Sequence, residues 1–200
     1  MIRPTIRAVL AAVGVAAAAL ALTASGPAAA GPAGPQTSGL APAAAACKTF
    51  TATNAAVQTR VVTTSDAALY ANTPAWADMA CGTTTVTAPR GRTVLTVVQV
   101  DAEVTCTGAD GQWCQGRVLI GNADGEPQAP EPDSFAWANS EPNAAQWEAN
   151  GFTRARDLAC PAKFPLPVCT WPVRVQVRTH VPGLLLRVDD STVHLAGTYH

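Results

Sequence analysis

Six cysteines constrain what this chain can fold into more than any other feature of its 200 residues. All of them follow residue 46, and none forms a CxxC pair or has a histidine at ligand-like spacing, which argues against a zinc site. An even number in an oxidising compartment favours structural disulfides, whereas a catalytic thiol would leave one cysteine unpaired. The six are Cys47, Cys81, Cys106, Cys114, Cys160 and Cys169.

The spacing of these cysteines predicts their pairing. Cys106 and Cys114 flank the segment TGADGQW, whose Asp-Gly step is a tight-turn dipeptide, so this pair is expected to join the two arms of a hairpin. Cys160 and Cys169 flank the proline-rich loop PAKFPLPV. The first two cysteines of the chain are then left for each other.

The N-terminus predicts export. Arg3 and Arg7 precede an uncharged apolar run, 8–22, and a series of small residues, which is the pattern of a secretory signal peptide over 1–30. A cut near residue 26 would fit the same pattern. The apolar run is too short to span a bilayer comfortably, so the chain is not expected to be membrane-spanning.

The remaining chain is expected to be one exported domain. Residues 31–46 are mostly Gly, Ala and Pro with little to bury, and are expected to form a flexible leader before a single domain, 47–200. Without 1–30 the basic residues fall from 13 to 11, since Arg3 and Arg7 are lost, against 14 acidic ones. Such a mildly acidic chain is a poor binder of polyanions, so no nucleic acid is expected as a partner. The expected location is secreted, extracellular or associated with the cell wall.

Alternation of apolar and polar residues predicts an all-β fold. Over 92–106 every second residue falls on one apolar face, while Gln99, Asp101 and Glu103 fall on the other. Shorter segments follow the same pattern. The strand candidates are 56–64, 83–88, 92–106, 117–121, 172–180, 184–188 and 192–199, together with 135–137 and 147–156.

Many short strands separated by turn residues predict an antiparallel β-sandwich or jelly roll, held by disulfides. Only 66–79 has a weak helical period, and Pro74 interrupts it. Arg174, Arg178 and Arg187 alternate with apolar residues and are expected to point outward, where they would protect edge strands from pairing with other chains.

Two segments of the chain resemble a known kind of protein. WPVRVQVRTHVPGLLLRVDDSTVHL, at 171–195, and WCQGRVLIGNADG, at 113–125, are similar to the closing strands of uncharacterised secreted β-sandwich proteins of bacteria. The excess of Arg over Lys and the abundance of Ala resemble actinobacterial proteins. The resemblance spans 92–200 and implies the fold, but it supplies no active residues. The insert from Asn122 to Asn150 departs from it.

Two places in the chain offer oxygen ligands that suit calcium, the one cofactor the sequence suggests. Asp124 and Glu126 lie at alternate positions, and Asp189 and Asp190 are adjacent at a strand end. An Asp-Gly turn and an exposed turn explain the same residues without a metal, so both interpretations stay open.

The insert also carries the candidate ligand site. Phe135 and Trp137 share one phase of the FAW step, and Trp147 follows with Glu141 and Glu148 nearby. Tryptophan faces stack on sugar rings as well as on core neighbours. These residues are interpreted either as a platform for an extracellular glycan or as a hydrophobic plug that holds the insert on the domain.

Catalysis has weaker support in the sequence. There is no Gly-x-Ser-x-Gly elbow, and His180, His194 and His200 have no serine and acid placed to form a triad with them. His194 is expected to face solvent. Two carboxylates of the insert could instead hydrolyse a glycosidic bond. The candidates are Asp124, Glu126, Glu131, Asp133, Glu141 and Glu148.

The sequence therefore predicts a secreted, disulfide-stabilised module that binds without catalysis, with an extracellular glycan or a cell-surface protein as its partner. A secreted hydrolase that uses the insert and a purely structural envelope protein are the alternatives. Exposure of both Trp137 and Trp147 would favour binding, and burial of both would favour packing.

Overall fold

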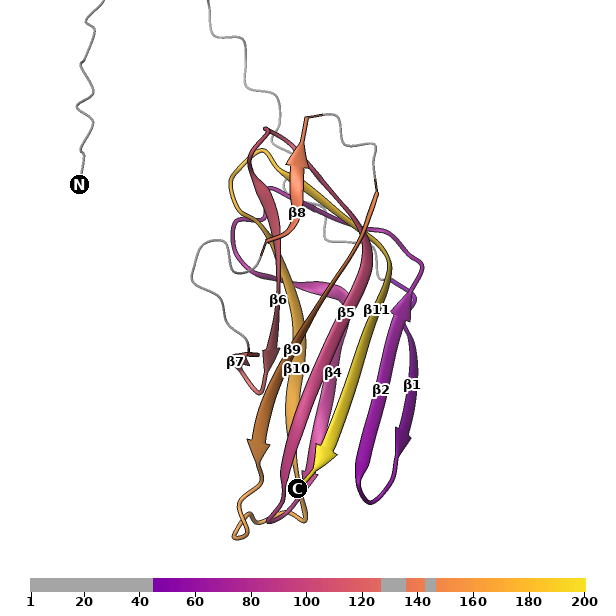
Figure 1. Ribbon diagram of the computed structural model, residues 1–200, viewed down its shortest axis with the longest axis vertical. Coiled ribbons are helices and arrows are strands. Elements are labelled where there is room, and N and C mark those ends of the chain that lie inside the picture. The colour runs from indigo at the N-terminus through magenta and orange to yellow at the C-terminus, as the bar shows by residue number, and fades with distance from the viewer. Residues whose placement is uncertain (1–44, 127–135, 143–146) are drawn as a thin grey trace, which may run out of the picture. The chain divides into compact units, whose positions relative to one another are not determined.

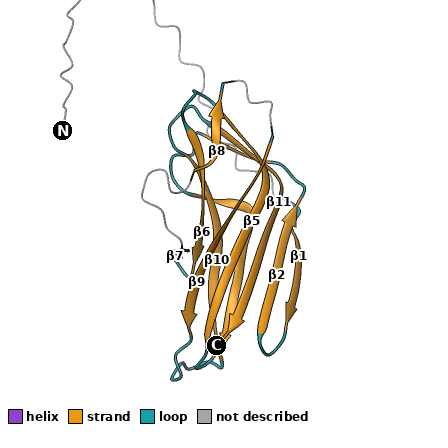
Figure 2. Cartoon of the chain, viewed as in Figure 1, coloured by secondary structure: helices purple, strands orange, loops and turns teal. Residues whose placement is uncertain are grey.

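The computed structural model describes residues 45–126, 136–142 and 147–200, and in these ranges every regular element is a β-strand (Figure 2). The all-β prediction is confirmed. The expected signal peptide and residues 31–44 of the expected leader lie outside the described residues. The strands are β1 (Lys48–Thr53), β2 (Val57–Thr64), β3 (Ala68–Ala71), β4 (Ala77–Pro89), β5 (Thr93–Thr107), β6 (Trp113–Ile120), β7 (Ala123–Asp124), β8 (Ala136–Glu141), β9 (Glu148–Ala159), β10 (Val168–Thr179) and β11 (Leu185–Tyr199).

The strands form one curled sheet in the order β1-β2-β11-β5-β8-β6-β10-β4, with β3 beside β11, β7 beside β6 and β9 beside β5. Figure 1 shows β2, β11 and β5 running side by side, as their registers require. All pairs are antiparallel except β5 with β8, which pair in parallel at Cys106 with Ser140 and at Thr107 with Glu141. None of the described residues forms a helix long and apolar enough to cross a membrane.

The core lies between the inward faces of the long strands. The alternation predicted for 92–106 is confirmed, because its apolar phase is buried while Gln99, Asp101 and Glu103 are exposed. Burying one Val or Leu side chain contributes about 1.5 to 3 kcal/mol, so these rows supply much of the stability. The fully buried members on β5, β10 and β11 are Val94, Val98, Val100, Val104, Val173, Val175, Val177, Leu186 and Leu195.

Three disulfides join the strands as the spacing predicted. They are Cys47–Cys81, Cys106–Cys114 and Cys160–Cys169. Cys81 sits where the register between β4 and β10 shifts, and its φ of 56° turns it out of the ladder towards Cys47. Three such bonds suit an oxidising environment of the extracellular type.

One buried side chain closes the sheet between β2 and β4. Gln58 of β2 is 2% exposed, and its amide donates to the carbonyl of Thr87 and accepts from the backbone N–H and hydroxyl of that residue, at 3.3 and 3.2 Å. Gly197 leaves the room, because a Cβ there would lie 2.9 Å from Cγ of Gln58. The Gln58 amide thus takes the place of a neighbouring strand at the free side of β4.

Residues 66–79, where the sequence has only a weak helical period, contain β3 and the start of β4, because pairing with β11 and β10 decides their conformation. One expectation about local structure was wrong. Arg174, Arg178 and Arg187 do not protect edges, since β10 and β11 each have strand neighbours on both sides. Strand order depends on long-range pairing, which alternation along one strand does not reveal.

Candidate functional site

A bulge in β11 places Asp190 on the outward face between two pockets. β11 pairs with β5 along most of its length, but the register shifts between Asp189 and Thr192. Asp190 has a φ of 42°, in the left-handed region that costs energy for a residue with a Cβ, and its N–H donates to Oδ1 of Asp189 at 2.9 Å. The sequence predicted a turn between two strands here. The structure has one continuous strand whose bulge turns the Asp190 carboxylate out of the ladder.

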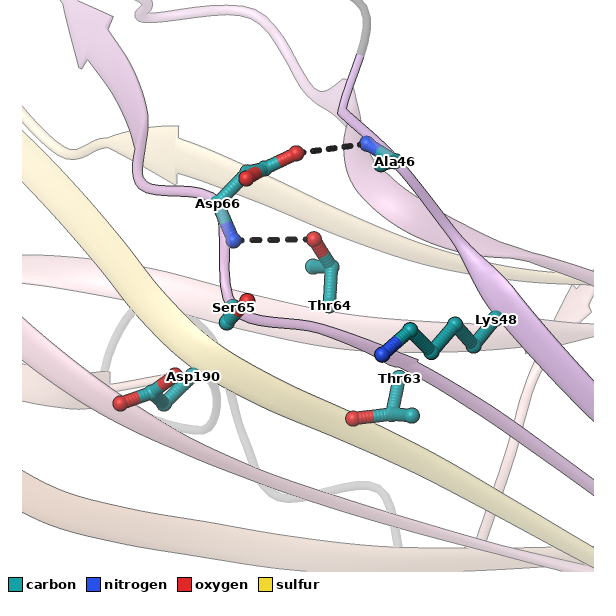
Figure 3. A pocket seen from close by; sticks show the side chains of 7 residues that line it. All are labelled: Ala46, Lys48, Thr63, Thr64, Ser65, Asp66 and Asp190. Carbon is teal, nitrogen blue, oxygen red and sulfur yellow. Dashed lines mark hydrogen bonds between the residues drawn. The ribbon is translucent and has the colours of Figure 1, made fainter.

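The first pocket, of about 270 Å³, lies beside the start of β1 (Figure 3). Its wall is fixed by Asp66, whose carboxylate accepts from the N–H of Ala46 at 2.7 Å and whose own N–H donates to Oγ1 of Thr64 at 3.0 Å. The pocket is therefore lined by one ammonium group, two carboxylates and three hydroxyl groups. The lining residues are Ala46, Lys48, Thr63, Thr64, Ser65, Asp66 and Asp190.

The second pocket, of about 290 Å³, lies over the paired strands β5 and β9. It shares Asp190 with the first pocket. A Cβ at Gly151 would lie 3.1 Å from the carbonyl oxygen of Val100 and would displace the carboxylate of Asp101 from its present position. The same carboxylate accepts from Nε2 of Gln99 at 2.8 Å. The lining residues are Asp101, Ala102, Glu103, Ala149, Asn150, Gly151 and Asp190.

An exposed tryptophan stands next to this second pocket. Trp147 precedes Ala149 by two positions, about 7 Å along the strand direction, and lies on the same outward face because side chains alternate. It is 38% exposed, and the guanidinium of Arg187 lies 5.0 Å from its ring centroid. A cation over an exposed ring contributes about 0.5 to 1 kcal/mol, so Arg187 holds the indole in place. We call this surface the Trp147 face; it consists of Trp147, Asp101, Glu103, Ala149, Gly151 and Asp190.

Trp137, by contrast, packs inside the protein. It is 7% exposed and meets the ring of Phe152 edge-on, at 5.4 Å and 88°. Both rings lie over Gly116, where a Cβ would come within 3.0 Å of each, and Nε1 of Trp137 donates to the carbonyl of Asn150 at 3.4 Å. The structure therefore separates the two tryptophans that the sequence grouped. Trp137 has a packing position and Trp147 a surface position.

The other members of the expected ligand site lie apart from the pockets. Glu141 ends β8 beside Thr107, and Glu148 opens β9 and accepts from Nδ2 of Asn150 at 2.9 Å. Neither lines the pockets described above. Phe135 lies outside the described residues.

Of the insert carboxylates expected of a hydrolase, the four that the structure describes do not meet in either pocket. Asp124 forms an ion pair with Arg117 at 3.7 Å, and Glu126 exchanges two backbone hydrogen bonds with Ala155. Glu141 and Glu148 were placed above, and the two remaining candidates, Glu131 and Asp133, lie outside the described residues.

Calcium receives no support from the geometry of the described ranges. The carboxylate of Asp124 is paired with Arg117, and Oδ1 of Asp189 accepts from the backbone of Asp190. In 45–126, 136–142 and 147–200 no three or more His, Cys, Asp or Glu side chains gather where they could hold a metal ion.

The histidines are spread over the fold. His194 lies on the outward phase of β11 opposite Gln99, as expected, while Val193 and Leu195 are buried. His180 stacks on Trp113 with ring centroids 4.5 Å apart, and Nε2 of His200 lies 3.9 Å from Oδ1 of Asp157. No described serine joins any of them in a hydrogen bond, so no triad is assembled in the described part of the chain.

One polar cluster was missed by sequence reasoning. The guanidinium groups of Arg117 and Arg178 both lie over the ring of Trp76, at 4.3 and 4.5 Å from its centroid. Gln176 joins them by accepting from Arg117 and donating to Asp78 at 2.8 Å. The alternating Arg and Gln of β10 were the available signal, but the tryptophan comes from a distant segment. These contacts tie the outward side chains of β4, β6 and β10 together.

Comparisons with protein-family models, with curated proteins and with solved structures each return no match for this chain.

Proposed function

We propose that this protein is a secreted, non-enzymatic binding module whose Trp147 face holds an extracellular glycan. One observation carries the proposal: a partly exposed indole stands beside a polar pocket on a single outward face of the sheet.

The chemistry of the Trp147 face matches a sugar chain. The C–H face of a sugar ring is flat and apolar and stacks on an indole, whereas its hydroxyls donate to carboxylates in charge-assisted hydrogen bonds. Asp101, Glu103 and Asp190 supply such acceptors along the path of a sugar chain that starts beside Trp147 and continues over the second pocket. The contact with Arg187 restrains the indole weakly, which lowers the ordering cost of binding by a small amount.

The expected architecture places this face on one layer of a β-sandwich. In this view β1, β2, β11, β5 and β9 form one layer, and β8, β6, β10 and β4 form the other. Val100 of β5 and Val175 of β10 are both fully buried, and Trp137 of β8 packs on Phe152 of β9, which supports two layers that face each other. The outward side of the first layer is then a broad surface that suits a polymer. The three disulfides and the signal-like pattern of 1–30 support a secreted location.

A glycan array followed by calorimetric titration tests this function. The wild type should retain hydroxyl-rich polysaccharides of the kind found in bacterial cell walls, and Trp147→Ala should weaken binding about tenfold or more, the effect of about 1.4 kcal/mol. Leu166→Ala is the matched control, because Leu166 is 59% exposed and lies outside both the Trp147 face and β1.

Thermal unfolding of both variants checks that the fold is kept. Failure of the wild type to retain any glycan, or equal binding by the wild type and Trp147→Ala, would contradict the proposal.

A further inference from the structure

β1 is a bare edge strand. All six of its residues are exposed, including Phe50 at 59%, so neither of its faces is covered. Its pairing with β2 runs from Lys48 to Thr53 without a shift in register, and it contains no proline and only one charge. Natural edge strands usually carry bulges, prolines or several charges that discourage pairing with other chains.

The backbone of β1 offers a defined set of free groups. The N–H of Asn54 donates to the carbonyl of Val57 at 2.8 Å, in line with the β1–β2 register. Successive residues of a strand direct their N–H and C=O groups to alternate sides, so the even-numbered residues of β1 bond to β2. Thr49, Thr51 and Thr53 therefore direct their N–H and C=O groups away from the sheet. The described part of the chain provides no partner for them.

The other open sides of the sheet are protected. On β4, the side-chain amide of Gln58 already bonds to the backbone N–H and C=O of Thr87. β4 is also irregular where its register with β10 shifts. On β9, the backbone of Glu126 bonds to Ala155 in both directions at 2.7 Å, and Arg156 and Asp157 add charge beside it. β1 is the exception in the described part of this fold.

We propose that β1 is an interface for a second copy of this chain, with the two β1 strands pairing antiparallel across a two-fold axis. A two-fold axis perpendicular to the sheet keeps outward side chains on the outward side, so residues of equal phase must face each other. A register centred on Thr51 satisfies this condition. It sets Thr51 opposite Thr51 of the second copy and Thr49 opposite Thr53 of the second copy, which uses every free group in about six hydrogen bonds.

The side chains and charges of β1 fit this register. Phe50 faces Ala52 of the second copy, so an exposed ring is covered by a small side chain. Lys48 faces Asn54 of the second copy, so no two like charges meet across the interface. Like charges placed directly opposite each other on paired strands are destabilising, and their absence allows self-association.

Charge-swapped variants test both the interface and its register. The chain is produced in an exporting host and studied by sedimentation velocity from about 5 μM to about 1 mM, a range that covers the weak affinity of a small interface. The wild type should sediment increasingly as a dimer as its concentration rises. Thr51→Lys and Thr51→Glu should each weaken dimerisation about tenfold or more, and mixing the two variants should restore it, because opposite charges then meet at the axis.

Matched controls separate the interface from a general effect of charge. Thr153→Lys and Thr153→Glu change an exposed threonine of β9 and should leave the association unchanged. In hydrogen exchange, the amides of Thr49, Thr51 and Thr53 should gain protection with rising concentration, whereas the amide of Phe50, already bonded to β2, should not. The proposal is overturned if the wild type stays monomeric over the whole range, if the Thr51 variants associate as the wild type does, or if their mixture stays monomeric.

Discussion

Replacing Gln58 with methionine should weaken the closure between β2 and β4. Methionine keeps the length and approximate volume of the side chain but can neither donate to the carbonyl of Thr87 nor accept from its N–H. The substitution therefore removes hydrogen bonds without creating a large cavity, which separates this effect from a loss of packing.

The structure sets the size of the effect. Three hydrogen bonds join Gln58 to Thr87, and each contributes about 1 kcal/mol net, which gives about 3 kcal/mol. Burying the apolar end of methionine at a position that is 2% exposed recovers about 1 kcal/mol. The free energy of unfolding should therefore fall by about 2 kcal/mol.

Urea unfolding followed by circular dichroism measures this loss, which should lower the midpoint by about 1 M at an unchanged slope. Gln99→Met is the control, because Gln99 is exposed and makes one surface contact with Asp101, so it should change stability by less than about 0.5 kcal/mol. Equal stability of Gln58→Met and wild type would refute the role given to Gln58.

Two other predictions concern stability. Replacing both Cys47 and Cys81 with alanine should lower the free energy of unfolding by about 3.8 kcal/mol, the loop-closure entropy of a 34-residue separation. Little packing is lost, because Cys47 is exposed. A loss below about 1 kcal/mol in urea unfolding would contradict this prediction. Burial raises the pKa of the Tyr70 phenol above its ordinary value of 10.0, so its contribution to stability is present below that pH and is lost as pH rises through the raised pKa. Unfolding free energies measured from about pH 9 to about pH 11 should therefore fall more steeply for the wild type than for Tyr70→Phe, and parallel slopes would argue against this role.

Strands with one buried face could be predicted from the sequence. The expected strand over 92–106 corresponds to β5 at Thr93–Thr107, and that over 172–180 overlaps β10 at Val168–Thr179, because burial of one face imposes period two on the side chains. β1 was missed for the opposite reason. All its residues are exposed, so no face had to be apolar and no period marks it.

The disulfides were predictable because two of the three are local. Cys106–Cys114 and Cys160–Cys169 each close a short loop that is visible in the sequence, and the third bond follows once these are assigned. The bulge at Asp190 was not predictable, since adjacent polar residues at a strand end resemble a turn. Only the continued pairing of β11 with β5 shows a single strand.

The candidate site depended on registers that no local pattern contains. Trp137 and Trp147 lie in the same insert, in similar surroundings of alanine and glutamate. Pairing of β9 with β5 places Gly151 opposite Asp101 and so sends the odd-numbered residues, Trp147 among them, outward. Trp137 belongs to β8 and packs on the inward Phe152. The sequence could therefore identify aromatic candidates but not divide them between surface and core.

The most direct test of glycan binding at the Trp147 face is a nuclear magnetic resonance titration of the five tryptophan indole N–H signals with cell-wall oligosaccharides. The Trp147 signal should shift saturably while the Trp137 signal, from a ring that is 7% exposed, stays in place. An unmoved Trp147 signal at saturating oligosaccharide would contradict the proposed function.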